Sequence, residues 1–255
     1  MNLIATGVLA SLAAGVATGV GALPLLMVRK LSDQAQNAFL GFAAGVMLAA
    51  AFFSLIIPAL DAAELNTGSE VRAALVVVVA VLLGAAALHV LNALAPHEHF
   101  LAGHHGAVAP GLSRVWLFVI AITLHNIPEG LAVGVSYGVG PEKGGPVALG
   151  IGLQNMPEGL AVAASLAAFY RRSVAVGLAL ATGLVEPVAA AVGLAAVSVA
   201  TGLLPWGLGF AAGAMIWVVS SEIIPETHRD NRQGLSTAAL MVGLVAMMFL
   251  DVVFG

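Results

Sequence analysis

The sequence predicts an all-α integral membrane protein with eight transmembrane helices in a 3+2+3 inverted-repeat arrangement. Three observations carry this prediction. The 255 residues are 60% hydrophobic and only 9% charged, whereas soluble domains average about 25% charged residues. Eight apolar runs are long enough to cross a bilayer. Short repeats relate the first three runs to the last three, and another repeat relates the two runs between them.

The eight apolar runs define the predicted spans, since a hydrocarbon core of about 30 Å requires roughly 20 residues of helix. The first run follows no basic segment, so it is expected to be a retained span and not a cleaved signal. The runs are Leu3–Val28, Asn37–Leu60, Val71–Ala95, Arg114–Val139, Pro146–Phe169, Ser173–Ala200, Leu204–Ile224 and Leu235–Phe254.

Lysine and arginine residues indicate the orientation, because cytoplasmic loops are enriched in both. With eight spans, only Arg72 and Lys143 fall on one side of the membrane. Both termini are therefore expected on the non-cytoplasmic side. The seven basic residues on the cytoplasmic side are Arg29, Lys30, Arg114, Arg171, Arg172, Arg229 and Arg232.

The repeats predict how the single transmembrane domain, residues 1–255, is organised. "GFAAGVM" at 41–47 matches "GFAAGAM" at 209–215, and "SLIIP" at 54–58 matches "SEIIP" at 221–225. Because span two runs outward and span seven inward, the two halves are expected to be inverted copies, a plan common among secondary transporters. The expected parts are a first three-helix repeat (1–95), a cytoplasmic His-rich loop (96–113), a central metal-binding helix pair (114–169) and an inverted three-helix repeat (173–255).

The central pair carries the polar residues that indicate chemistry. Span four contains "HNIPEG" and span five contains "QNMPEG". A spacing of three or four residues places the side chains on one helix face. Two such faces could hold two cations bridged by the glutamates, and imidazole, carboxylate and amide oxygens suit divalent metals such as Zn²⁺. The alternative is polar contact between packed helices. The candidate ligands are His125, Asn126, Glu129, Gln154, Asn155 and Glu158.

Other spans supply further candidates. Glu186 lies mid-span in span six and Met47 in span two, although Met47 could equally be core filler. Glu222 and Glu226 flank Pro225 in the inner part of span seven, as exit residues or as solvated ones. Each ionised carboxylate at the centre of a membrane costs about 2.5 kcal/mol or more on insertion scales. We therefore expect protons to replace the metal when it leaves the site.

Candidate metal-attracting residues also lie at the outer entrance and at the cytoplasmic end of the predicted pathway. Ser54, Asp61 and Asp251 lie near the outer ends of spans two and eight, where acidic groups attract cations. The cytoplasmic loop "HEHFLAGHHG" is either a solvated loop or a weak metal-capture site. Its candidate ligands are His97, His99, His104 and His105.

These motifs resemble the signature of the ZIP (Zrt/Irt-like) family of metal-ion transporters, in its bacterial form, over essentially the whole chain. The resemblance implies a 3+2+3 fold in the bacterial inner (plasma) membrane and an elevator or rocking movement of one helix group. It implies a first metal at His125, Glu129, Gln154 and Glu158 with Met47 nearby. It implies a second metal at Asn126, Glu129, Asn155, Glu158 and Glu186. Many relatives have histidine at the position of Gln154, which leaves Cd²⁺, Fe²⁺ or Mn²⁺ open beside Zn²⁺.

Several functions compete with import of a divalent metal into the cytoplasm. A membrane-embedded metallohydrolase is one alternative, but the H-E-x-x-H signature is absent. A proton-coupled carrier of an organic solute and an ion channel are the others. No nucleic-acid partner is expected, because the net charge is −4 and the basic residues are scattered. No catalytic residue or organic cofactor is expected for a transporter. The partners are the transported metal and the bilayer, and a homodimer stays open.

Overall fold

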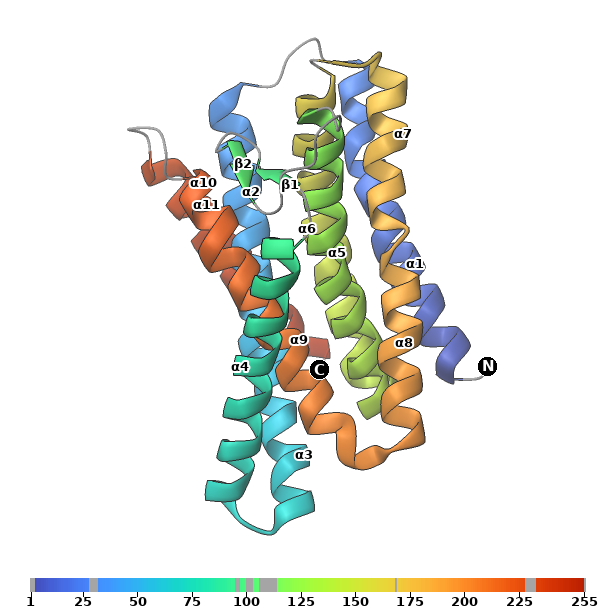
Figure 1. Ribbon diagram of the computed structural model, residues 1–255, viewed down its shortest axis with the longest axis vertical. Helices are drawn as coiled ribbons and strands as arrows, with labels where there is room; N and C mark the ends of the chain where they lie inside the picture. The colour runs from blue at the N-terminus through green and yellow to red at the C-terminus, as the bar shows by residue number, and fades with distance from the viewer. Residues whose placement is uncertain are drawn as a thin grey trace.

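A computed structural model describes residues 3–27, 32–94, 97–99, 103–105, 114–167, 169–227 and 233–254. The described part is helical apart from two three-residue strands (Figure 1). The elements, in order, are α1 (Leu3–Ala22), η1 (Leu23–Leu26), α2 (Asp33–Ala49), η2 (Ala50–Ile56), α3 (Ile57–Thr67), α4 (Glu70–Leu94), β1 (His97–His99), β2 (Gly103–His105), α5 (Arg114–Val139), α6 (Pro141–Leu166), α7 (Arg172–Gly183), α8 (Glu186–Val199), η3 (Thr201–Leu203), α9 (Leu204–Val218), η4 (Val219–Ile223), α10 (Ile224–Thr227) and α11 (Gln233–Phe254).

Six helical stretches among the described residues are long and apolar enough to cross a membrane. They are Leu3–Leu26, Gln34–Thr67, Glu70–Leu94, Arg172–Val199, Thr201–Ile223 and Gln233–Phe254. The other two predicted spans correspond to α5 and α6, which have 26 residues each and carry the polar motifs. Length and composition therefore make this a membrane protein.

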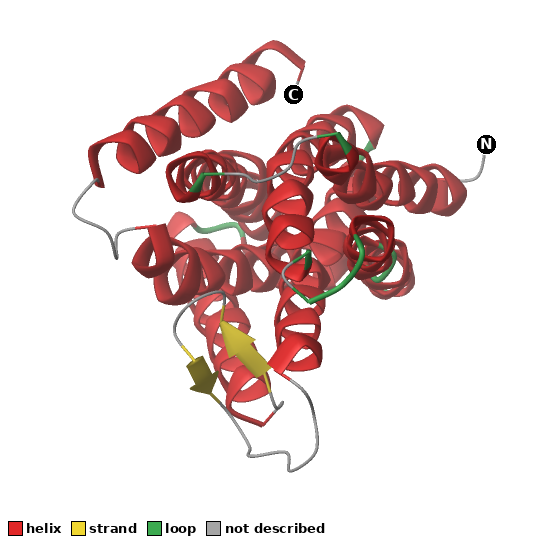
Figure 2. Ribbon diagram, turned by 90° about the horizontal axis from the view of Figure 1, so that it is seen from above, coloured by secondary structure: helices red, strands yellow, loops and turns green. Residues whose placement is uncertain are grey.

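The helices pack as two bundles that face each other along the centre of the molecule. One bundle contains α1, α5, α6, α7 and α8, and the other contains α2, α3, α4, α9, α10 and α11. The contacts between the bundles run mainly through α6 against α2 and through α5 against α9. Figure 1 shows α8 beside α5, and Figure 2 shows α11, the helix that ends at the C-terminus, at the edge of the molecule. The two central helices thus lie along the seam between the bundles.

The packing follows the sequence repeat. α2 packs on α11, and its repeat partner α9 packs on α4. A Cβ added to Gly45 of α2 would lie 1.9 Å from the carbonyl oxygen of Leu240, and one added to Gly213 of α9 would lie 2.0 Å from that of Val81. Small residues allow membrane helices to approach this closely. Gly45 and Gly213, which match in the repeated sequence, therefore allow the same close helix contact in the two halves.

Both repeated segments also contain a stretch of π-helix. η2 spans Ala50–Ile56 and η4 spans Val219–Ile223, and a proline follows each of them, Pro58 and Pro225. A π-segment accommodates extra residues within a helix. The seven-residue η2 and the five-residue η4 fall where the two repeats differ by one residue between "GFAAG" and "IIP". The difference in length is thus absorbed inside the helices and not in a loop.

Several element boundaries differ from the sequence prediction. Helix through α2, η2 and α3 runs from Asp33 to Thr67, beyond the predicted Asn37–Leu60, and α6 begins at Pro141 and not at Pro146. Span six is interrupted between Gly183 and Glu186. Pro187 has no N–H to donate to the carbonyl of Gly183, which accounts for the interruption. The segment 96–113 contains the antiparallel pair β1–β2, in which His97 lies opposite His105.

Candidate metal centre

The two repeated motifs bring six polar side chains into the interior. His125, Asn126 and Glu129 project from α5 and are 7%, 1% and 0% exposed. Gln154, Asn155 and Glu158 of α6 are similarly buried, and all six have the spacing that places them on one face of their helix. Both helices continue through the motif prolines Pro128 and Pro157. The polar faces therefore meet at mid-helix, where a membrane protein can least easily solvate them.

A hydrogen bond joins the two motifs directly. Nε2 of Gln154 donates to Oε1 of Glu129 over 2.5 Å. The carboxylate of Glu129 is also close enough to Glu158 and Glu186 for like-charge repulsion to act on it. Three carboxylates from three helices thus share a small interior volume, which makes this a strong cation-binding environment.

Glu186 connects α8 to this cluster. Nδ2 of Asn155 donates to Oε1 of Glu186 over 2.7 Å and also to the carbonyl oxygen of Ala14 on α1 over 2.9 Å. Glu186 is the first residue of α8 and is 0% exposed. A helix N-terminus favours a nearby negative charge. The interruption of span six therefore places a carboxylate at a helix start inside the bundle.

His125 connects the cluster to the second bundle. Its Nε2 is hydrogen-bonded to Oε2 of Glu222 in η4, and Nδ2 of Asn92 in α4 donates to Oε1 of the same carboxylate. Glu222 is 8% exposed, and the electrostatic attraction of His125 to Glu222 and to Glu158 adds to the bond. A chain of three polar side chains therefore crosses the seam between the bundles.

Several buried polar atoms in the cluster have no hydrogen-bond partner within the described structure. They include Oδ1 and Nδ2 of Asn126, Oε2 of Glu129, Oε1 of Gln154 and Oε2 of Glu186. Leaving a buried polar group unpaired costs roughly 1–3 kcal/mol. Four oxygens from four motif or neighbouring residues are thus free to accept a cation, which fits a metal substrate.

The ligands are not drawn together around one point. Among the residues that the structure describes, no three histidine, cysteine, aspartate or glutamate side chains are grouped closely enough to hold a metal ion. Three of the candidate ligands are instead hydrogen-bonded to other side chains: Glu129 to Gln154, Glu186 to Asn155, and His125 to Glu222.

The glycine after each motif glutamate sets the distance to the neighbouring helix. A Cβ on Gly130 would lie 2.3 Å from the carbonyl oxygen of Glu186, and one on Gly159 would lie 1.9 Å from that of Thr18. Both distances are too short for a side chain, so these glycines permit the close approach of the helices. α5 against α8 and α6 against α1 are therefore equivalent contacts.

Comparison with known proteins identifies the family. The family model for the ZIP zinc transporter matches residues 96–251. The chain is 49% identical over 251 residues to the zinc transporter GufA of Myxococcus xanthus, covering 98% of this chain and 99% of that protein. It is 47% identical over 250 residues to the zinc transporter ZIPB of Bordetella bronchiseptica, covering 97% and 81%. The chain belongs to the ZIP family of zinc transporters.

The similarity extends to eukaryotic members of the ZIP family. The zinc transporter ZIP11 of Homo sapiens is 34% identical over 299 residues, covering 85% of this chain and 87% of that protein. A ZIP protein is a membrane transporter and not an enzyme. The metallohydrolase alternative is therefore wrong.

The remaining sequence candidates have different places in this ZIP protein. Met47 is 1% exposed and belongs to a hydrophobic core to which both bundles contribute. Ser54 and Asp251 meet, because the hydroxyl of Ser54 donates to Oδ1 of Asp251 over 2.7 Å. Asp61 is exposed on α3. The side chains of Glu226, His97, His99, His104 and His105 lie outside the described residues.

Sequence reasoning missed two groups that contact the candidate ligands. Asn92 holds Glu222, and the carbonyl oxygen of Ala14 holds Asn155. Asn92 is an amide residue in an otherwise apolar run, so the sequence alone could have indicated a polar contact at this position. A backbone carbonyl has no signature in the sequence, so the role of Ala14 required the structure.

Proposed function

We propose that this protein moves zinc into the cytoplasm through a binuclear site inside the membrane, by alternating access. The observation that carries the proposal is the set of unpaired oxygens of Asn126, Glu129, Gln154 and Glu186 in a buried cluster of carboxylates. Such a cluster lacks positive charge, and divalent cations supply it. The names of the similar proteins agree with zinc as the substrate.

The site divides into two metal positions. The first would use His125, Glu129, Gln154 and Glu158, with Met47 at its edge. The second would use Asn126, Glu129, Asn155, Glu158 and Glu186. The unpaired Oε1 of Gln154 supports the first position, and the unpaired Oδ1 of Asn126 supports the second. Glu129 and Glu158 would bridge the two ions, so their charge is shared and the repulsion between the carboxylates is relieved.

The two bundles suggest what moves. All eight of the proposed ligand residues except Met47 belong to the bundle of α1, α5, α6, α7 and α8. An elevator or rocking movement of this bundle against the other would carry the metals with it. The hydrogen bond between His125 and Glu222 crosses the seam. It would therefore have to break during the movement, and Glu222 would take the metal or a proton on the exit side, followed by Glu226.

The equivalent packing of the two halves supports a 3+2+3 inverted repeat. The contact of α2 with α11 corresponds to that of α9 with α4, and the contact of α6 with α1 corresponds to that of α5 with α8. Repeats related in this way exchange places between the two access states. With the distribution of lysine and arginine, this arrangement would place both termini outside the cytoplasm, and Ser54, Asp61 and Asp251 at the entrance.

The metal preference follows from Gln154. An amide oxygen is a harder and weaker ligand than imidazole, so the first position should discriminate less strongly among divalent metals. Cadmium and iron are therefore proposed as further substrates, and the histidines of residues 97–105 as weak capture sites. Proton release on metal binding would couple the transport rate to pH.

Radiozinc uptake into proteoliposomes tests the proposal, with and without a pH gradient. Wild-type protein should accumulate zinc, and unlabelled cadmium or iron should compete. Control liposomes with Glu142→Gln, an exposed position in the first turn of α6, should behave like wild type. Uptake that is absent under all gradients, or that zinc does not saturate, would contradict a zinc carrier. Currents far above carrier rates would instead indicate a channel.

A further inference from the structure

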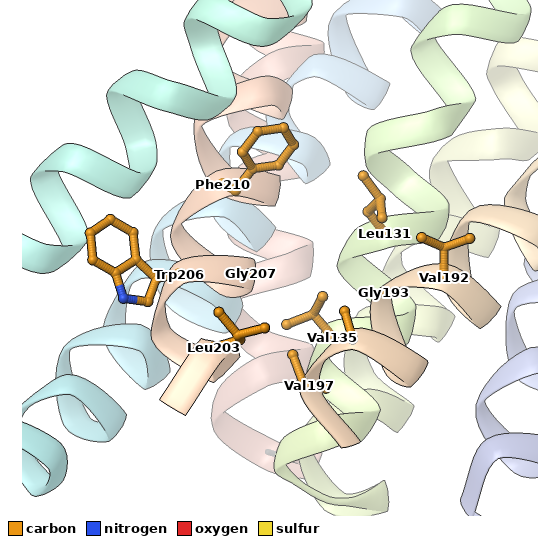
Figure 3. Close-up of a pocket in the computed structure, with 10 residues that line it drawn as sticks. Leu131, Val135, Val192, Gly193, Val197, Leu203, Trp206, Gly207 and Phe210 are labelled. Atoms are coloured by element: carbon orange, nitrogen blue, oxygen red, sulfur yellow. The ribbon is translucent and has the colours of Figure 1, made fainter. Parts of the chain in front are cut away.

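Two apolar grooves open on the seam between the bundles, and the sequence repeat relates them. The first lies among α1, η1, α2, α6 and α11 and has a volume of about 710 Å³. The second lies among α5, α8, η3 and α9 and has a volume of about 260 Å³ (Figure 3). Phe42 lines the first and Phe210 the second, and these are matching residues of "GFAAG". Leu160 and Leu131, which match in "PEGLAV", also correspond.

The grooves differ in size because of one pair of matching positions. Ala38 lines the large groove, and Trp206 stands at the same place in the repeat. In Figure 3 the indole of Trp206 is directed away from Leu131 and Val192, toward the side on which α4 passes. No residue of α4 lines the small groove within the described structure, whereas four residues of α11, the counterpart of α4, line the large one.

The total size of the side chains at these positions does not explain the difference in volume between the two grooves. The neighbouring pair, Phe39 and Gly207, differs in the opposite sense. What matters is the direction of the side chain, since an indole at position 206 separates the small groove from α4. The methyl group of Ala38 leaves the matching space between α2 and α11 open. The large groove therefore extends to α11, which supplies one of its walls.

The large groove faces the lipid side of the metal-carrying helix. Leu153, Met156 and Pro157 of α6 line it, while Gln154, Asn155 and Glu158 point into the candidate metal centre. Leu153 and Met156 are 39% and 40% exposed, and Val242 on the opposite wall is 61% exposed. At this position the surrounding solvent is hydrocarbon, because the walls belong to membrane-spanning helices.

We propose that this groove binds the acyl chain of a membrane phospholipid, which contacts α6 and α2 at the same time. The groove is wholly apolar at its lining residues, is open to the bilayer, and is within the size range of ligand sites. Phosphatidylglycerol, a bilayer phospholipid with two acyl chains, is the probe.

Native mass spectrometry of the purified full chain with palmitoyl-oleoyl phosphatidylglycerol tests this proposal. Wild type should retain one lipid, and Ala38→Trp should retain none. Trp206→Ala should retain two, because it opens the second groove toward α4. Leu83→Trp is the matched control, since Leu83 is 52% exposed on α4 and lines neither groove; it should retain one lipid.

Equal retention by wild type and Ala38→Trp would overturn the proposal, as would the absence of a second lipid on Trp206→Ala. Should Ala38→Trp fail to fold, Ala239→Phe on the α11 wall replaces it under the same criterion. These measurements do not involve zinc. Failure here would therefore leave the proposed metal transport untouched, and failure of zinc uptake would leave the lipid site untouched.

Discussion

The motifs of α5 and α6 match residue by residue, yet their side chains are held differently. Among the described residues, the amide atoms of Asn126 of α5 have no hydrogen-bond partner, whereas its counterpart Asn155 donates to Glu186 and to the carbonyl of Ala14. His125 is bonded to Glu222 in the other bundle, whereas its counterpart Gln154 is bonded to Glu129 in the same bundle. The repeat therefore specifies where the ligands lie, and the neighbouring helices decide what each ligand does without metal.

This difference assigns separate tasks to the two helices. The polar residues of α6 are hydrogen-bonded within their own bundle, to Glu129, Glu186 and α1. His125 of α5 is hydrogen-bonded across the seam to Glu222, so under the proposed movement its bond would depend on the position of the other bundle. Substitutions at matching positions should therefore have equal effects where the ligand is shared and unequal effects where the partners differ.

The largest expected effect is on zinc uptake and concerns Glu129 and Glu158, the matching glutamates at which the two motifs should behave alike. Glu129→Ala and Glu158→Ala should each lower zinc uptake by about 100-fold or more, since each removes a carboxylate that both proposed metal positions would share. Radiozinc uptake into proteoliposomes measures the effect, with Glu142→Ala as the control in the same helix as Glu158. Uptake near the wild-type rate in either variant would show that the carboxylate does not bridge the metals.

The next largest effect is expected on metal affinity and preference, at His125 and Gln154, the residues with which the two motifs begin. Exchanging the residue types one at a time, His125→Gln should lower the zinc affinity by about 10- to 100-fold, because an imidazole ligand and its bond to Glu222 are both lost. Gln154→His should strengthen zinc binding relative to cadmium and iron, because the position becomes a nitrogen ligand. Competition among the three metals in uptake assays checks both variants.

The opposite result for either variant would be informative. A Gln154→His protein with an unchanged order of metal preference would place the selectivity elsewhere than in the first metal position. A His125→Gln protein with unchanged zinc affinity would show that His125 contributes to the contact between the bundles and not to zinc binding.

The sequence predicted the spans and the meeting of the six buried motif side chains because both depend on local patterns; that these side chains bind metal stays a prediction. Apolar runs of sufficient length and the spacing of polar residues on a helix face can be read directly from the amino-acid sequence. The break before Glu186 was not predicted, although Pro187 signalled it, because span six remains apolar on both sides. The link from Asn92 through Glu222 to His125 joins residues far apart in the chain, and only the packing of α4, η4 and α5 brings them together.

The smallest expected effect tests the two asparagines by stability and not by transport. Asn155→Ala removes two buried hydrogen bonds and leaves Oε1 of Glu186 without its donor, so it should destabilise the metal-free protein by about 1–3 kcal/mol. Asn126→Ala removes two atoms that have no partner in the described structure, so it should leave the stability unchanged or raise it. Thermal unfolding in detergent without metal measures the difference, and adding zinc should stabilise both variants less than wild type. An Asn126→Ala protein that is as unstable as Asn155→Ala would mean that the two motifs are held alike, and the contrast between α5 and α6 would then fail at this position.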